Sequence, residues 1–154
     1  CNISARLHLS CKKKCVMKRF LSIDFDYFID CDKATRDALF PTMDETIPKP
    51  VRKQIWKQAY LEHRTKLTQI SILKEDYKDL LDICRRFSGL YRQHDSHRYI
   101  YNFIMDHTAP KKVFEVYNID FHHDMYHLHT RNERVNCGNW VNILKEDRPD
   151  MQYY

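Results

Sequence analysis

The sequence has only two glycines in 154 residues and no long apolar segment. Charged residues make up 31% of the chain and hydrophobic residues 43%, a balance that excludes a linker-rich or disordered chain. No stretch approaches the roughly 18 uninterrupted apolar residues of a membrane span. We therefore expect one globular domain with a substantial hydrophobic core and no membrane contact.

The sequence also lacks a zinc-binding cysteine pattern. Its six cysteines have spacings that match no zinc site, and the chain is longer than small disulfide-stabilised scaffolds. We expect reduced thiols in a cytoplasmic protein. The net charge of +5 is moderate, and apart from residues 12–14 the basic residues are spread along the chain. The sequence therefore does not indicate a nucleic-acid partner. It leaves the oligomeric state open, with a homo-oligomer as one option.

The first residues differ in character from the rest of the chain. Residues 1–16 show neither strand nor helix periodicity, and a lysine run precedes Met17. A signal peptide would place its charges before an apolar segment and end on small residues, and here that order is not found. We expect residues 1–16 to be a tail or upstream sequence and residues 17–154 to form the domain.

Residues 118–124 (NIDFHHD) contain the strongest chemical signal, because four of these seven side chains can bind a metal. They follow an apolar run at 113–117 that predicts a buried strand. Ligand sites in open α/β sheets lie beyond the carboxyl ends of such strands. If the segment is extended, Asp120, His122 and Asp124 share one face and can converge on a divalent cation. The alternative is a solvated polar transition from strand to loop.

Two other segments carry side chains of the same type. A β-favouring run over 20–28 is interrupted by Asp24 and Asp26 on one face. Two carboxylates this close repel each other unless a cation lies between them, although an exposed strand end would also accommodate them. A predicted helix over 96–107 has His97 in its first turn, where a plain surface histidine is the alternative.

Helical spacing of apolar residues and turn-forming residues predict the remaining elements. We expect a surface loop over 30–50, helices over 51–67, 74–87 and 139–145, and a short strand over 90–93.

Three stretches together resemble the motifs of the ureohydrolases, the arginase and agmatinase superfamily. Residues 95–97 (DSH) stand where that family has Gly-Asp-His, residues 120–124 where it has Asp-x-His-x-Asp, and residues 22–26 (SIDFD) where it has Ser-x-Asp-x-Asp. The closest similarity is to a divergent branch that includes peptide arginases. That branch has an Asp-x-Asp-Tyr/Phe-Phe strand and an Asn-Trp pair, as at 26–28 and 139–140.

The sequence departs from the family in four ways. The Asp-x-Asp stretch comes first instead of last, Asp-Ser-His replaces Gly-Asp-His, and the chain is much shorter. The carboxylate that binds the substrate guanidinium in arginases has no assignable counterpart in this sequence. The resemblance therefore implies an arginase/deacetylase-like α/β domain over residues 17–154, a three-layer α/β/α fold with a mostly parallel sheet, present as an incomplete fragment.

The resemblance also implies a site with two manganese ions. Asp24 and Asp120 would bridge the ions, and carboxylate and imidazole donors without thiolate suit Mn²⁺ better than Zn²⁺. One ion would bind His97, Asp120, Asp124 and Asp24, and the other would bind Asp120, His122, Asp24 and Asp26.

The implied reaction is the hydrolysis of a guanidinium group. Two adjacent ions activate a water that attacks the guanidinium carbon and releases urea. The substrate would be an arginine residue of a peptide, converted to ornithine, or a small guanidinium compound. His123, His127 and His129 are candidate proton shuttles, and Asn139 and Trp140 are candidates for shaping the substrate pocket.

Two alternatives remain open from the sequence. In a haloacid-dehalogenase-type phosphatase, Asp24 would be the nucleophile and Asp26 the acid, with Mg²⁺ as the cofactor. Phe28 replaces the Thr or Val of that family, and the histidine-rich motif would have no role. In the second alternative the chain is a non-enzymatic module that binds metal without turnover.

Overall fold

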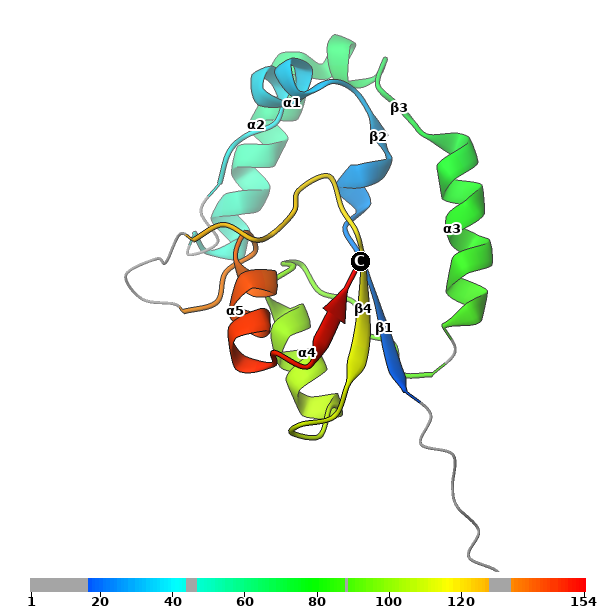
Figure 1. Ribbon diagram of the computed structural model, residues 1–154. Helices are drawn as coiled ribbons and strands as arrows, with labels where there is room; N and C mark the ends of the chain where they lie inside the picture. Colours follow the sequence, from blue (N-terminus) through cyan, green and yellow to red (C-terminus); the bar gives the residue numbers. More distant parts are fainter. Residues whose placement is uncertain (1–16, 44–46, 88, 128–133) are drawn as a thin grey trace, which may run out of the picture.

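The computed structural model describes residues 17–43, 47–87, 89–127 and 134–154. Within these ranges the elements follow one another along the chain as shown in Figure 1: β1 (Lys18–Ile23), the 3-10 helix η1 (Phe25–Phe28), β2 (Ile29–Asp30), α1 (Lys33–Leu39), α2 (Lys49–Leu67), β3 (Ser71–Ile72), α3 (Lys74–Arg86), α4 (Tyr99–His107), β4 (Phe114–Ile119), α5 (Trp140–Asp147) and β5 (Met151–Tyr153).

The main sheet contains β1, β4 and β5, with β4 in the centre and both pairings parallel. β1 pairs with β4 from Lys18–Phe114 to Ile23–Ile119. β2 and β3 form a separate, antiparallel pair. Parallel neighbours need crossover connections, and here helices lie in the connection between β1 and β4 and in that between β4 and β5. The described chain is therefore an α/β fold with a mostly parallel sheet, as expected.

The carboxyl ends of β1 and β4 meet at one edge of the sheet. The backbone N–H of Asp24 donates to the carbonyl of Ile119 at 2.8 Å, so the ladder extends one residue beyond β1. Asp24 and Asp120 therefore begin two loops that leave the sheet side by side. This edge is where ligand sites form in open parallel sheets.

The core lies between the sheet and helices α4 and α5, which cover one face of it (Figure 1). Alternate residues of β4, Phe114 and Val116, are buried on this face. Burial of one such side chain stabilises a fold by about 1.5–3 kcal/mol. On the opposite side Figure 1 shows α3, and Phe87 after it contacts Tyr117 of β4 with ring centroids 5.6 Å apart. The core cluster comprises Ile104, Phe114, Val116, Trp140, Val141 and Leu144.

Most of the elements predicted from the sequence are present. The predicted strand over 113–117 corresponds to β4, and the helices predicted over 51–67, 74–87, 96–107 and 139–145 correspond to α2, α3, α4 and α5. Their boundaries differ by up to three residues.

The run over 20–28 is not one strand, contrary to the prediction. β1 ends at Ile23, and the Asp24 carboxylate accepts a hydrogen bond from the backbone N–H of Asp26 at 3.1 Å. This cap turns the chain into η1. Short carboxylate side chains bind nearby backbone N–H groups and so compete with strand pairing.

Two further predictions were wrong. The segment predicted as a surface loop over 30–50 contains α1, which the Asp32 side chain caps by accepting from the N–H of Thr35 at 2.7 Å. No strand forms over 90–93. The short strands β3 and β5 were not predicted from the sequence.

Two further expectations concern membranes and cysteines. No helix in the described ranges is long and apolar enough to cross a membrane. Cys31 and Cys84 are free thiols. The predicted tail, residues 1–16, lies outside the described residues.

Candidate metal centre

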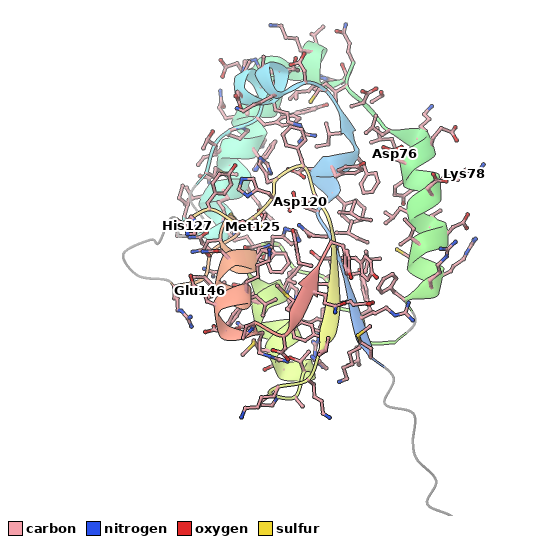
Figure 2. The ribbon with its side chains drawn as sticks, viewed as in Figure 1. Asp76, Lys78, Asp120, Met125, His127 and Glu146 are labelled. Carbon is pink, nitrogen blue, oxygen red and sulfur yellow. The ribbon has the colours of Figure 1, made fainter. Side chains whose placement is uncertain are left out.

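The six candidate ligands come from three segments of the chain that meet at the carboxyl edge of the sheet. The first segment follows β1, the second immediately precedes α4, and the third follows β4. Figure 2 shows Asp120 directly beyond the end of β4. The sheet register therefore brings together residues that lie far apart in sequence.

The first cluster of donor atoms belongs to Asp24, His97 and Asp120, and these atoms lie within 4.8 Å of one another. The Nδ1 atom of His97 lies 3.0 Å from Oδ2 of Asp120, 2.9 Å from Oδ2 of Asp124 and 3.7 Å from Oδ2 of Asp24. Adjacent ligands of an octahedral cation, each at 2.0–2.1 Å from it, lie about 2.9 Å apart. The distances from Nδ1 of His97 to Asp120 and Asp124 match this spacing, whereas Asp24 lies further away.

The second cluster contains Asp26, Asp120 and His122, again within 4.8 Å. The Nδ1 atom of His122 lies 3.3 Å from Oδ2 of Asp26 and 3.8 Å from Oδ1 of Asp120. Asp120 therefore faces His97 with one carboxylate oxygen and His122 with the other. This is the arrangement that a carboxylate shared by two cations requires.

The centre of the site is buried, and several of its polar atoms are not satisfied by the protein. The side chain of Asp120 is 2% exposed and that of His97 is 6% exposed. Within the described part of the chain, Oδ1 of Asp26, Oδ2 of Asp120 and Nδ1 of His97 have no hydrogen bond of acceptable geometry. Leaving a buried polar group unsatisfied costs about 1–3 kcal/mol. A cation at this point would coordinate such atoms directly.

Two further side chains contact the buried ligands on the side away from the cluster. The Nε2 atom of His97 lies 2.6 Å from the hydroxyl of Ser22, which leaves its Nδ1 atom directed at the carboxylates. The indole N–H of Trp140 donates to Oδ2 of Asp124 at 2.6 Å. Metal-binding histidines and carboxylates commonly have such outer partners, which fix their orientation. Ser22 was not predicted as a site residue, although it lies two residues before Asp24 in the same motif.

Arg36 of α1 connects the two ligand loops and was also missed. One of its Nη atoms donates to the backbone carbonyls of Asp26 and of Ile29, the latter at 3.0 Å. The other lies 3.7 Å from Oδ2 of Asp26. The guanidinium also lies 4.0 Å from the centre of the Phe121 ring, in the loop after β4. This buried cation thereby fixes η1 against the Asp120 loop.

The pKa values in the cluster are displaced because like and unlike charges are buried together. Burial lowers the pKa of His97, but the adjacent carboxylates of Asp120 and Asp124 outweigh this effect and raise it to about 9. Burial raises the pKa of Asp124 to about 6. Burial and the charges of Asp24 and Asp120 raise the pKa of Asp26. The metal-free cluster therefore retains protons near neutral pH that a cation would displace.

Residues 120–124 form a turn and not the extended segment that the alternation of ligands assumed. The backbone N–H of His122 donates to Oδ1 of Asp120 at 2.8 Å, and Asp124 has a φ of 50°, in the left-handed region. Asp can adopt this region more readily than most residues. Because the chain turns, Asp120 and Asp124 both reach His97, whereas His122 faces Asp26. The prediction of one shared strand face was therefore wrong.

The three candidate proton shuttles occupy different environments. His123 lines the cavity beside the cluster, and its Nδ1 accepts from the N–H of Met125 at 3.0 Å. His127 is exposed and its Nδ1 lies 3.1 Å from the side-chain amide of Asn142 on α5. His129 lies outside the described residues.

The two candidate pocket residues lie inside the protein. Trp140 is fully buried behind the cluster, with its ring centroid 5.4 Å from that of His97. Asn139 is also fully buried, where its side chain accepts from the N–H of Asn136 at 2.7 Å and donates to the carbonyl of Arg134 at 3.0 Å. Neither is among the side chains that line the adjacent cavity.

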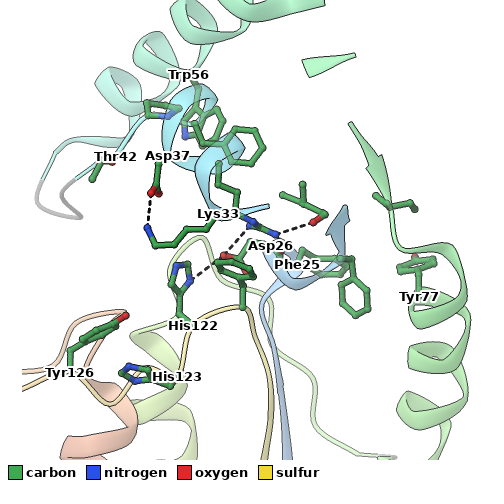
Figure 3. Close-up of a pocket in the computed structure, with 17 residues that line it drawn as sticks. Phe25, Asp26, Lys33, Asp37, Thr42, Trp56, Tyr77, His122, His123 and Tyr126 are labelled. Atoms are coloured by element: carbon green, nitrogen blue, oxygen red, sulfur yellow. Dashed lines mark hydrogen bonds and ion pairs between the residues drawn. The ribbon is translucent and has the colours of Figure 1, made fainter. Parts of the chain in front are cut away.

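That cavity has a volume of about 980 Å³ and opens beside the second cluster. Figure 3 shows His122 directed towards Asp26, with Trp56 on one side of the cavity and His123 and Tyr126 on the other. Both Asp26 and His122 line it. The cavity thus gives a ligand access to the exposed side of the cluster.

Comparisons with known proteins found no similarity to this chain: no family model, curated protein or solved structure matches it significantly. The function of this protein must therefore be inferred from its motifs and from the geometry of the site.

Proposed function

We propose that this protein is a manganese-dependent hydrolase of the ureohydrolase type, which releases urea from arginine residues of a peptide and leaves ornithine. One observation carries the proposal. The three stretches that resemble the ureohydrolase motifs, residues 22–26, 95–97 and 120–124, meet at one edge of a parallel sheet, and the carboxylate of Asp120 belongs to both clusters of donor atoms.

The donor set fits two divalent cations of the manganese type. It contains carboxylate oxygens and imidazole nitrogens and no thiolate, which favours Mn²⁺ over softer metals. His97, Asp24 and Asp124 would hold one ion, His122 and Asp26 the other, and Asp120 both. Asp24, which the resemblance implied as a second bridging ligand, lies in the first cluster of donor atoms among the described residues. When bound, two such ions act as Lewis acids and lower the pKa of a water molecule to about 7.

The other residues of the site would orient the ligands, exclude water and move protons. Ser22 and Trp140 fix His97 and Asp124 through hydrogen bonds. Asp124 and Trp140 are buried, so solvent water does not reach the side of the cluster that faces the core. His123 is our candidate for the proton shuttle because it lines the cavity, and a histidine can accept and return a proton near neutral pH.

The fold that we propose with this function is a three-layer α/β/α domain of the arginase/deacetylase type. Its support is the parallel sheet with α4 and α5 on one face and α3 on the other (Figure 1). A phosphatase that uses Asp24 and Asp26 alone is less well supported. It would leave the close contacts of His97 with Asp120 and Asp124 without a role.

The test is urea release from an arginine-containing peptide by the Mn²⁺-loaded protein, followed by mass spectrometry for the loss of CN₂H₂. Asp120→Asn should abolish the reaction, whereas Asp76→Asn, on the exposed surface of α3, should not. A generic phosphate ester should be assayed in parallel with Mg²⁺. Phosphate release without urea, lost in Asp24→Asn, would overturn the proposal in favour of a phosphatase.

A further inference from the structure

The cavity beside the second cluster is larger than the reaction alone requires. It lies between η1, α1, α2 and the loop after β4 (Figure 3). Its volume of about 980 Å³ is near the upper end of the roughly 300–1,000 Å³ range of small-molecule pockets. A guanidinium group that reaches Asp26 and His122 would fill only one end. The rest of the cavity is available to another part of the same substrate.

Aromatic side chains that are incompletely buried gather around this cavity. Phe25 is 64% exposed, Trp56 and Tyr126 are each 43% exposed, and Phe121 is 41% exposed. Single exposed apolar residues are normal on a protein surface, but a contiguous apolar patch marks a place where something binds. Covering these rings with an apolar group would remove their surface from water.

The charged groups of the cavity already have partners among the described residues. Lys33 Nζ lies 2.5 Å from Oδ2 of Asp37, and Arg36 is engaged by Asp26 and by backbone carbonyls. A free amino acid's carboxylate would therefore have to displace Asp37 from Lys33 or Asp26 from Arg36. An uncharged side chain fits this lining better.

We infer that the cavity is a subsite for an aromatic or large aliphatic side chain that neighbours the reacting arginine in a peptide substrate. The inference rests on the proposed function for the reaction, but the subsite can be measured by binding alone. It makes Trp56 a specificity-determining residue, because its exposed ring lies opposite the His123 side of the cavity (Figure 3).

The experiment compares two arginine peptides that differ only by phenylalanine or glycine beside the arginine. Kd for the Mn²⁺-loaded protein of 154 residues is measured by calorimetry, and KM by urea release. The phenylalanine peptide should bind about tenfold tighter or better, which is the effect expected from burying one large apolar side chain. The difference should appear in KM with kcat unchanged, since the contact is made equally in the ground and transition states.

A matched pair of variants tests the location. Trp56→Ala should reduce the preference for phenylalanine to less than threefold. Tyr60→Ala should leave it unchanged, because Tyr60 lies one turn further along α2, is 44% exposed against 43% for Trp56, and does not line the cavity. Both variants replace exposed rings, so equal thermal midpoints should show that both are folded.

The outcomes separate the two proposals. Peptide binding that prefers phenylalanine and depends on Trp56, without urea release, would support the subsite and overturn the reaction. Urea release with equal KM for both peptides would support the reaction and overturn the subsite. Self-association that Trp56→Ala disrupts, with equal peptide affinities, would assign the aromatic patch to a second copy of the chain and overturn the subsite.

Discussion

The indole of Trp140 and the carboxylate of Asp124 form a 2.6 Å hydrogen bond inside the protein, and the acceptor, Oδ2 of Asp124, is also the oxygen that lies 2.9 Å from His97. One atom therefore connects the hydrophobic core to the candidate metal centre.

Trp140→Phe should weaken metal binding while it preserves most of the packing. Loss of an outer hydrogen bond of this kind typically costs 10–100-fold in metal affinity. Leaving the buried acceptor unsatisfied should also lower the free energy of unfolding of the metal-free protein by about 1–3 kcal/mol. Mn²⁺ titration and urea denaturation measure the two effects, with Trp56→Phe as the control. Unchanged affinity would show that this bond does not orient Asp124.

Metal stoichiometry should depend on which cluster a substitution affects. The unmodified protein should bind two Mn²⁺ ions per chain by elemental analysis. Asp120→Ala should lose both, because Asp120 belongs to both clusters, whereas His122→Ala should retain one. His123→Ala should bind two, since His123 belongs to neither cluster. Metal-free protein recovered at saturating Mn²⁺ would contradict the shared site.

Metal affinity should rise with pH because ligands must lose their protons before they bind. The pKa of His97 is raised to about 9 in the metal-free protein, so between pH 7 and pH 8 each bound Mn²⁺ in the first cluster should displace about one proton. The apparent affinity should then increase about tenfold per pH unit in this interval. Below about pH 6 further protons should be released from Asp124.

Calorimetry in buffers of different ionisation enthalpy counts these protons directly. His97→Asn should abolish the release near neutral pH, whereas His123→Asn should retain it. An affinity that is constant between pH 7 and pH 8 would contradict the assignment of His97 as a ligand.

Arg36→Leu should affect the second cluster more than the first. The substitution removes the bonds that hold η1 against the Asp120 loop, so Asp26 should lose its fixed position while His97 keeps its partners. We expect the stoichiometry to fall from two ions to one, with a stability loss of about 1–3 kcal/mol. Lys33→Leu, on the exposed side of the same helix, is the control. A loss of both ions would mean that Arg36 supports the whole fold.

The sequence predicted β4, part of β1 and the ligand-bearing segments, because these features depend on local patterns. Apolar runs end just before Asp24 and Asp120, and the helix that follows His97 has a clear apolar periodicity. Once β1 and β4 are parallel neighbours, the residues after them must lie at the same edge. These features need no knowledge of distant contacts.

The remaining features depend on interactions between distant segments. Arg36 lies in a stretch bounded by turn-forming residues, which concealed α1, and its partners belong to η1 and to the loop after β4. The turn at 120–124 follows from the conformation of Asp124, which the alternation of ligands does not reveal. β5 is only three residues long and has no apolar run. It is recognised as a strand only by its pairing with β4, which a local sequence pattern does not reveal.

The pairing of β1 with β4 also has a consequence for the order of events during folding. Lys18 pairs with Phe114, and Ser22 contacts His97 across 75 positions of sequence. Contacts between such distant positions form late and slowly, because a long loop must close first. The donor atoms then come together only after the native topology is established. Manganese should therefore slow unfolding of the finished protein much more than it accelerates folding.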